Sequence, residues 1–96
     1  MDRFIMYGNY TPEAIKGSIG QPDQNRRVAA EMMTEAVGAE LLDFFLTKGE
    51  YDFVAIGRGS SAQILAIKMA TMASGSLFNL HVLEEVDLQE PATLAS

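Results

Sequence analysis

The sequence predicts a small α+β domain with the element order βαββαβ. Strand-like and helix-like apolar patterns alternate in this order between residues 4 and 86, and 96 residues are too few for two independent cores. With 48% apolar and 21% charged residues, the composition is that of a packed chain rather than a disordered one. We therefore expect one domain over residues 1–96, with residues 87–96 as a loose or arm-like tail.

The first predicted strand covers residues 4–9, which are rich in aromatic and branched side chains and end at Gly8 and Asn9. A short helix should follow, because Thr11 can cap the free amides of a first helical turn and Pro12 suits the first helical position. The glycines of residues 17–20 should end this helix.

A second helical segment should begin at Pro22 and Asp23. Its apolar residues recur at helical spacing and are Ala29, Met32, Met33, Ala36 and Val37. The adjacent pair Arg26 and Arg27 is interpreted as a solvated helix start. Gly38 follows where a left-handed residue commonly ends a helix.

Two further strands are predicted as a hairpin, over residues 41–46 and 51–56, joined by a tight link at residues 48–50. Gly57 and Gly59 should break the second of these strands.

The last helix and strand complete the order. Ser60 and Gln63 have the spacing of a capping box at the start of a helix that Gly75 can stop. Residues 77–86 then predict a fourth strand, with Phe78, Leu80 and Val82 at alternate positions. This is the ferredoxin-like arrangement: a four-stranded antiparallel sheet with the helices on one face.

Successive side chains of a strand point to opposite faces of the sheet, so a sheet with one face in water should be polar at every second position. In these strands the side chains of both faces are apolar. In the second strand, Leu41 and Phe45 share one parity, while Leu42, Phe44 and Leu46 share the other. The helices can cover one face only. We therefore expect a homodimer or higher homo-oligomer through the uncovered face.

Charge and cysteine content exclude several functions. A net charge of −6 opposes nucleic-acid binding, and RNA recognition on an RRM-like sheet would need basic residues around exposed aromatic ones. Without cysteine there is no disulfide or thiolate site, and with one histidine we expect no metal and no cofactor. No leader or membrane-spanning run is apparent, so we expect a cytoplasmic protein without a membrane partner.

A set of short motifs follows the predicted elements in order: Tyr10-Thr11-Pro12-Glu13-Ala14 with Lys16-Gly17, Arg26-Arg27, Gly38, and Gly49-Glu50-Tyr51-Asp52 leading into Val54-Ala55-Ile56. In these motifs the sequence resembles the GYD domain family, a group within the dimeric α/β-barrel superfamily. The motifs are spread over residues 4–86. The resemblance implies the ferredoxin-like fold and a sheet-to-sheet dimer, and it implies no particular activity or catalytic residue.

Six polar residues at or near strand ends could contact a ligand. His81 is the single histidine and could face a cavity in the dimer, and Tyr51 beside Asp52 could orient or deprotonate a small substrate. The full set is Tyr7, Asn9, Tyr51, Asp52, Arg58 and His81.

Two functions remain open from the sequence. The first is a homo-oligomeric module that is non-catalytic or binds a small apolar molecule. The second is a cofactor-independent enzyme of the oxygenase or isomerase type that uses a cavity in the dimer. The residues do not distinguish an enzyme from a binding module, and they do not name a ligand.

Overall fold

The computed structural model of the chain describes residues 2–23 and 25–96 and has the predicted ferredoxin-like fold. Its elements are β1 (Asp2–Tyr10), α1 (Pro12–Gly20), α2 (Arg26–Ala36), β2 (Glu40–Leu46), β3 (Phe53–Gly59), α3 (Ser61–Ser74), β4 (Leu77–Glu84) and α4 (Gln89–Ala95). The four strands form one sheet in the order β2-β3-β1-β4, and every neighbouring pair is antiparallel.

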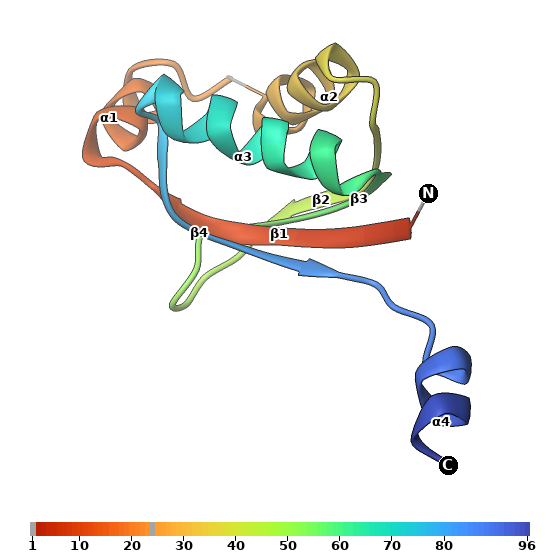
Figure 1. Cartoon of the computed structure of the whole chain (residues 1–96). Coiled ribbons are helices and arrows are strands. Elements are labelled where there is room, and N and C mark those ends of the chain that lie inside the picture. The colour runs from red at the N-terminus through yellow and green to blue at the C-terminus, as the bar shows by residue number, and fades with distance from the viewer. Residues whose placement is uncertain (1, 24) are drawn as a thin grey trace.

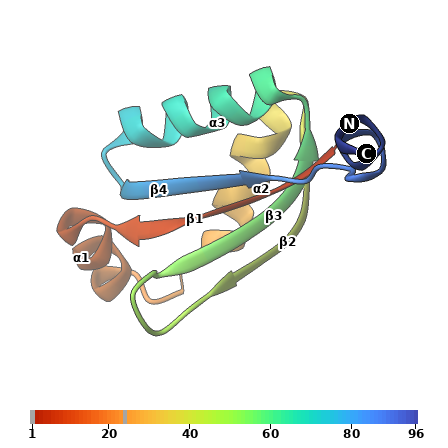
Figure 2. The same ribbon diagram turned by 60° about the horizontal axis from the view of Figure 1, so that its bottom comes forward.

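The molecule has two layers (Figure 1). The helices α1, α2 and α3 lie on one face of the sheet, and the opposite face carries no helix of the same chain, as the view from that side shows (Figure 2). We call these the helix face and the open face.

The helix ends follow the predicted capping pattern, with one correction. The Thr11 side chain accepts a hydrogen bond from the Ala14 amide, and Ser60 with Gln63 forms a complete capping box. Gly38 and Gly75 have φ angles of 82° and 73°, the left-handed conformation that glycine adopts most readily. The prediction that α2 begins at Pro22 and Asp23 was wrong: Asn25 caps this helix.

Glycines 57 and 59 do not break β3, contrary to the sequence prediction. They lie inside the strand on the helix face, where the Phe4 ring packs over Gly57. A β-carbon at position 57 would lie 2.6 Å from the Phe4 ring and 2.8 Å from the Glu40 carbonyl oxygen. These glycines serve close packing against the sheet, which sequence alone does not separate from a strand break.

Two β-bulges change which face the outer strands present. One extra residue lies in β2 between Leu41 and Asp43, and another lies in β4 opposite Gly8. Beyond the first bulge, Phe44 pairs with Ala55 on the helix face and Phe45 pairs with Val54 on the open face. The parity predicted for this strand was therefore wrong, because alternation fails at a bulge.

The core lies between the sheet and α2 and α3. Its buried apolar members are Phe4, Met6, Ala39, Phe53, Ile64 and Ile67. The methionines do not all pack there: Met6 and Met33 face the core, whereas Met32, Met69 and Met72 are exposed on the helices.

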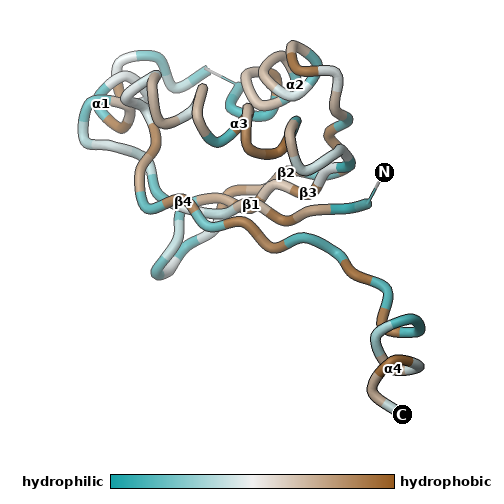
Figure 3. Tube along the Cα trace, in the orientation of Figure 1, coloured by the Kyte–Doolittle hydropathy of each residue, from teal (hydrophilic) through white to brown (hydrophobic). Residues whose placement is uncertain are grey.

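The C-terminal arm, residues 85–96, leaves the end of β4 and carries α4 away from the helix layer (Figure 1). The hydropathy trace shows apolar segments along this arm (Figure 3). Val86, Leu88 and Leu94 expose 69%, 70% and 81% of their surface. The arm therefore presents apolar side chains that its own chain leaves uncovered.

Candidate functional site

An aromatic cluster lies on the open face and unites three of the predicted site residues. Tyr7 on β1 stacks on His81 of β4 at a ring distance of 5.2 Å, because the two residues pair across the strands. Tyr51 meets both rings edge-on, at 4.7 Å from Tyr7 and 5.5 Å from His81. Edge-to-face and offset-stacked rings at these distances attract one another.

A chain of hydrogen bonds joins two more predicted site residues, Asn9 and Asp52, to this cluster. The Asn9 amide donates to Asp52 at 3.2 Å and its oxygen accepts from Asn79 at 3.0 Å. Asn79 in turn lies 3.2 Å from the His81 ring nitrogen Nε2. Asp52 also accepts from the Tyr10 backbone amide at 2.9 Å. The carboxylate of Asp52 is thus used to hold the strand ends together.

The sequence prediction did not include Asn79. This residue has a φ of 53° at the bulge in β4, a conformation that asparagine tolerates better than most residues. An asparagine among alternating apolar residues was the available signal.

Arg58 does not join this cluster. It pairs with Arg3 across β1 and with Glu40 across β2, whereas Tyr7 pairs with Val54. Four residues of strand therefore separate it from the aromatic cluster, about 13 Å. The structure brings together five of the six predicted site residues.

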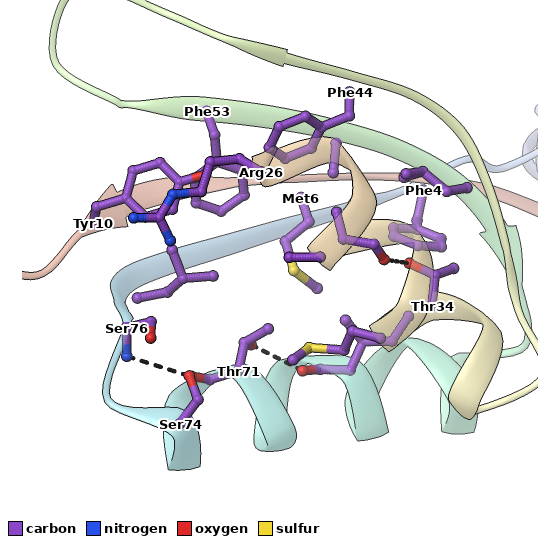
Figure 4. A pocket seen from close by; sticks show the side chains of 17 residues that line it. Phe4, Met6, Tyr10, Arg26, Thr34, Phe44, Phe53, Thr71, Ser74 and Ser76 are labelled. Carbon is purple, nitrogen blue, oxygen red and sulfur yellow. Dashed lines mark hydrogen bonds between the residues drawn. The ribbon is translucent and has the colours of Figure 1, made fainter. Parts of the chain in front are cut away.

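A pocket of about 270 Å³ lies on the other side of the sheet, between the strands and helices α2 and α3 (Figure 4). Its buried walls are mainly apolar and include Phe4, Met6, Phe53 and Ile67. It is partly open, and the lining residues Tyr10, Arg26, Ser74 and Ser76 lie at one end of it (Figure 4). We call this end, between the start of α2 and the end of α3, the pocket mouth.

Arg26 is held at the pocket mouth by its surroundings. Its guanidinium carbon lies 4.7 Å from the centre of the Tyr10 ring, and its Nη2 donates to the Ala14 carbonyl at 2.8 Å and to the Ser18 hydroxyl. It forms no ion pair with a described residue, unlike Arg27, which pairs with Glu31 and Asp43. The prediction that both arginines are solvated was wrong for Arg26.

The sequence carried one signal, which Arg26 and Arg27 share because both lie in the first turn of α2. A cation in the first turn of a helix opposes the positive end of the helix dipole, so it needs another source of stabilisation. For Arg26 that source is α1 and the Tyr10 ring.

Two tyrosines have raised pKa values. Burial raises the pKa of Tyr10, with nearby Arg26 acting in the opposite direction and Asp52 in the same one. Partial desolvation raises the pKa of Tyr51, helped by Glu50 and Tyr7. Both phenols are therefore protonated at neutral pH and can donate a hydrogen bond.

The family model of the GYD domain matches residues 4–94 of this sequence. The chain belongs to the GYD domain family. A comparison with curated proteins finds no match.

The fold of this GYD domain is also found in a solved structure, that of MtbAldR. The two chains superpose with a TM-score of 0.57 over 90% of this chain, at 7% sequence identity. The match spans 53% of the MtbAldR chain, so this GYD domain corresponds to about half of that structure. At this identity the likeness concerns the fold alone.

The described part of this GYD domain, residues 2–23 and 25–96, contains neither a group of metal ligands nor a membrane-spanning helix. No three acidic or histidine side chains are grouped as metal ligands would be. None of its helices has the length and apolar character needed to cross a membrane.

Proposed function

We propose that this GYD domain is a homodimeric module that binds a small, largely apolar molecule in the pocket between its sheet and helices. The observation that carries the proposal is the pocket itself. Native cores are packed so tightly that voids larger than a water molecule are few. A partly open space of about 270 Å³ beside the core is close to the lower end of ordinary ligand pockets, roughly 300 Å³.

The methionines of the chain allow a direct test of binding. Met6 and Met33 line the pocket, whereas Met32, Met69 and Met72 are exposed elsewhere on the molecule. With methyl-labelled methionine, titration with 1-octanol should shift the NMR signals of Met6 and Met33 and leave the other three in place. Shifts confined to the exposed methionines, or no shifts, would contradict a binding pocket.

The homodimer is inferred from the open face. Its centre is apolar and includes Ile5, Phe45, Val54, Ile56 and Leu83. The Arg3–Glu85 ion pair lies at one end of this centre, and the aromatic cluster with its polar groups lies at the other. An apolar centre with a polar rim is typical of protein interfaces.

The accessible surface supports a second copy as the partner. The chain exposes 6487 Å², whereas a folded monomer of its mass, 10.5 kDa, typically exposes roughly 5,400 Å². The excess is comparable with the roughly 800 Å² that each partner buries in a standard interface. Four strands of this length offer an open face on the order of 450 Å², so the C-terminal arm would supply the remainder.

Sedimentation velocity tests the homodimer. The wild type should sediment as a dimer at micromolar concentration, and Ile56→Lys, at the centre of the open face, should sediment as a monomer. Leu65→Lys is the matched control, because Leu65 is 57% exposed on the outer side of α3 and should leave the dimer intact. A wild-type monomer would overturn this part of the proposal.

A second candidate function rests on the aromatic cluster. A cofactor-independent enzyme would need a group that can exchange protons, and His81 between two tyrosines on the face closed by a dimer offers one. A small aromatic compound that raises the melting temperature of the wild type but not of His81→Ala or Tyr51→Phe would support a site there. Equal stabilisation of all three proteins by every compound would count against it.

A further inference from the structure

The polar groups of the pocket are distributed unevenly, and this asymmetry carries information about the ligand. The hydroxyls of Thr34, Thr71 and Ser74 donate to carbonyls of their own helices, at distances of 2.7 to 2.9 Å. Their protons are therefore used within the fold. The walls along α2 and α3 offer a ligand mainly apolar contact.

The donors that remain lie together at the pocket mouth. Arg26 uses Nη2 for its contacts to α1, while its Nε and Nη1 have no hydrogen-bond partner among the described residues. The Tyr10 hydroxyl likewise has no described partner, although the ring is half-buried beside Arg26. The remaining donors of Arg26 and the Tyr10 hydroxyl are thus available at one end of an apolar pocket, where the two side chains lie side by side (Figure 4).

No described acidic residue forms an ion pair with Arg26. Asp52 accepts hydrogen bonds from the Tyr10 amide and the Asn9 side chain, and it forms no ion pair with Arg26. Arg26 therefore keeps a positive charge in a partly desolvated position, where a charged hydrogen bond is stronger than in water.

Building on the proposed binding function, we infer that the ligand is an amphipathic anion: its apolar body fills the pocket, and its carboxylate or similar oxyanion binds Arg26 and Tyr10. Both edges through which a guanidinium can form two parallel hydrogen bonds to a carboxylate include Nη2, which Arg26 uses for its contacts to α1. The free Nη1 can still donate one charge-assisted hydrogen bond to the oxyanion. A cavity of about 150 Å³ holds benzene, so a pocket of about 270 Å³ suits a ligand of roughly ten non-hydrogen atoms.

The test compares two probes of the same length, octanoate and 1-octanol, by calorimetry and by the methyl signals of Met6 and Met33. Octanoate should bind the wild type roughly 10- to 100-fold more tightly than octanol, as expected for hydrogen bonds to a charged group. Octylammonium, with the opposite charge, should bind more weakly than either.

Variants then assign the head-group contact. Arg26→Gln should abolish the preference for octanoate, and Tyr10→Phe should reduce it roughly tenfold, as expected for the loss of one hydrogen bond to a charged acceptor. Arg27→Gln is the matched control, because this neighbouring arginine pairs with Glu31 on the same helix and does not line the pocket. It should leave both affinities unchanged.

The ratio of the octanoate and octanol affinities distinguishes loss of the head-group contact from a disturbed fold. Arg26 also holds α1, so its replacement could loosen the pocket, but a looser pocket weakens both probes alike and keeps their ratio. A preference for octanoate retained in Arg26→Gln, or equal binding of both probes to the wild type, would overturn the anionic head group while leaving the binding pocket intact. If octanol also fails to shift Met6 and Met33, the proposed function itself fails.

Discussion

The two faces of the sheet contain similar residues but are packed differently. On the helix face, Phe4 exposes 2% of its surface, packed over Gly57; on the open face, Phe45 exposes 44%. Both are phenylalanines in the same sheet. The difference teaches that composition sets how apolar a face is, while the elements available to cover it decide whether this apolar surface stabilises the single chain or an assembly.

The largest expected effect compares these two phenylalanines. Phe4→Ala should lower the free energy of unfolding by about 3–5 kcal/mol, because it removes a buried ring and leaves a cavity. Phe45→Ala should cost much less at low protein concentration, where the dimer is dissociated. Urea unfolding measures both, and equal losses would show that the two faces are equally packed within one chain.

A smaller effect is expected at Gly57. Gly57→Ala should destabilise the fold by about 1–3 kcal/mol, since the added carbon would meet the Phe4 ring and the Glu40 carbonyl. Gly17→Ala is the control, because nothing lies near that position in α1 and alanine favours the helix. Thermal unfolding should show the first variant less stable than the wild type and the second slightly more stable; a neutral Gly57→Ala would contradict the close packing.

Deletion of residues 86–96 should weaken self-association and leave the stability of the single chain unchanged. The arm places Val86, Leu88 and Leu94 in solvent, so its removal should leave the unfolding of the dilute protein unchanged. Self-association should weaken at least roughly tenfold, because each of these side chains contributes about 1.5–3 kcal/mol when fully buried. Sedimentation equilibrium measures the constant, and an unchanged value would show that the arm is not part of the interface.

The smallest effect concerns the ion pair at the rim of the open face. Arg3 Nη2 lies 2.6 Å from Glu85 Oε2, and hydrogen bonds from Arg3 lower the pKa of this carboxyl. A group whose pKa is lower in the folded state stabilises the fold above its unfolded pKa and loses this contribution as pH falls through the folded value. Stability of Glu85→Gln should therefore depend less on pH in the acidic range, as measured by thermal unfolding between neutral and acidic pH.

Most of the fold could be predicted from the sequence because the residues that define the helix ends lie close to one another in the chain. Thr11, Ser60 and Gly75 define helix ends through contacts within a few residues, and the structure confirms each of them. The glycines of β3 could not be interpreted in this way. Gly57 owes its role to Phe4, which is distant in sequence and adjacent only in the folded sheet.

The candidate sites show the same limit. Tyr7 and His81 could be proposed from their chemistry and parity, and the structure stacks them. The pocket mouth could not be proposed, because Tyr10, Arg26 and Ser76 belong to different elements that only tertiary packing brings together. The sequence offered one indirect sign, cations placed against a helix dipole, and this sign applies equally to Arg26 and Arg27.

The positions of the two bulges have a consequence for solubility. Both extra residues lie in the outer strands, β2 and β4, whereas the central pair β1–β3 keeps an unbroken register. An outer strand exposes unpaired backbone groups that can template growth of the sheet into fibrils, and a bulge interrupts this template and twists it away. The sheet can thus offer an apolar face to a partner while its outer strands, β2 and β4, resist open-ended polymerisation.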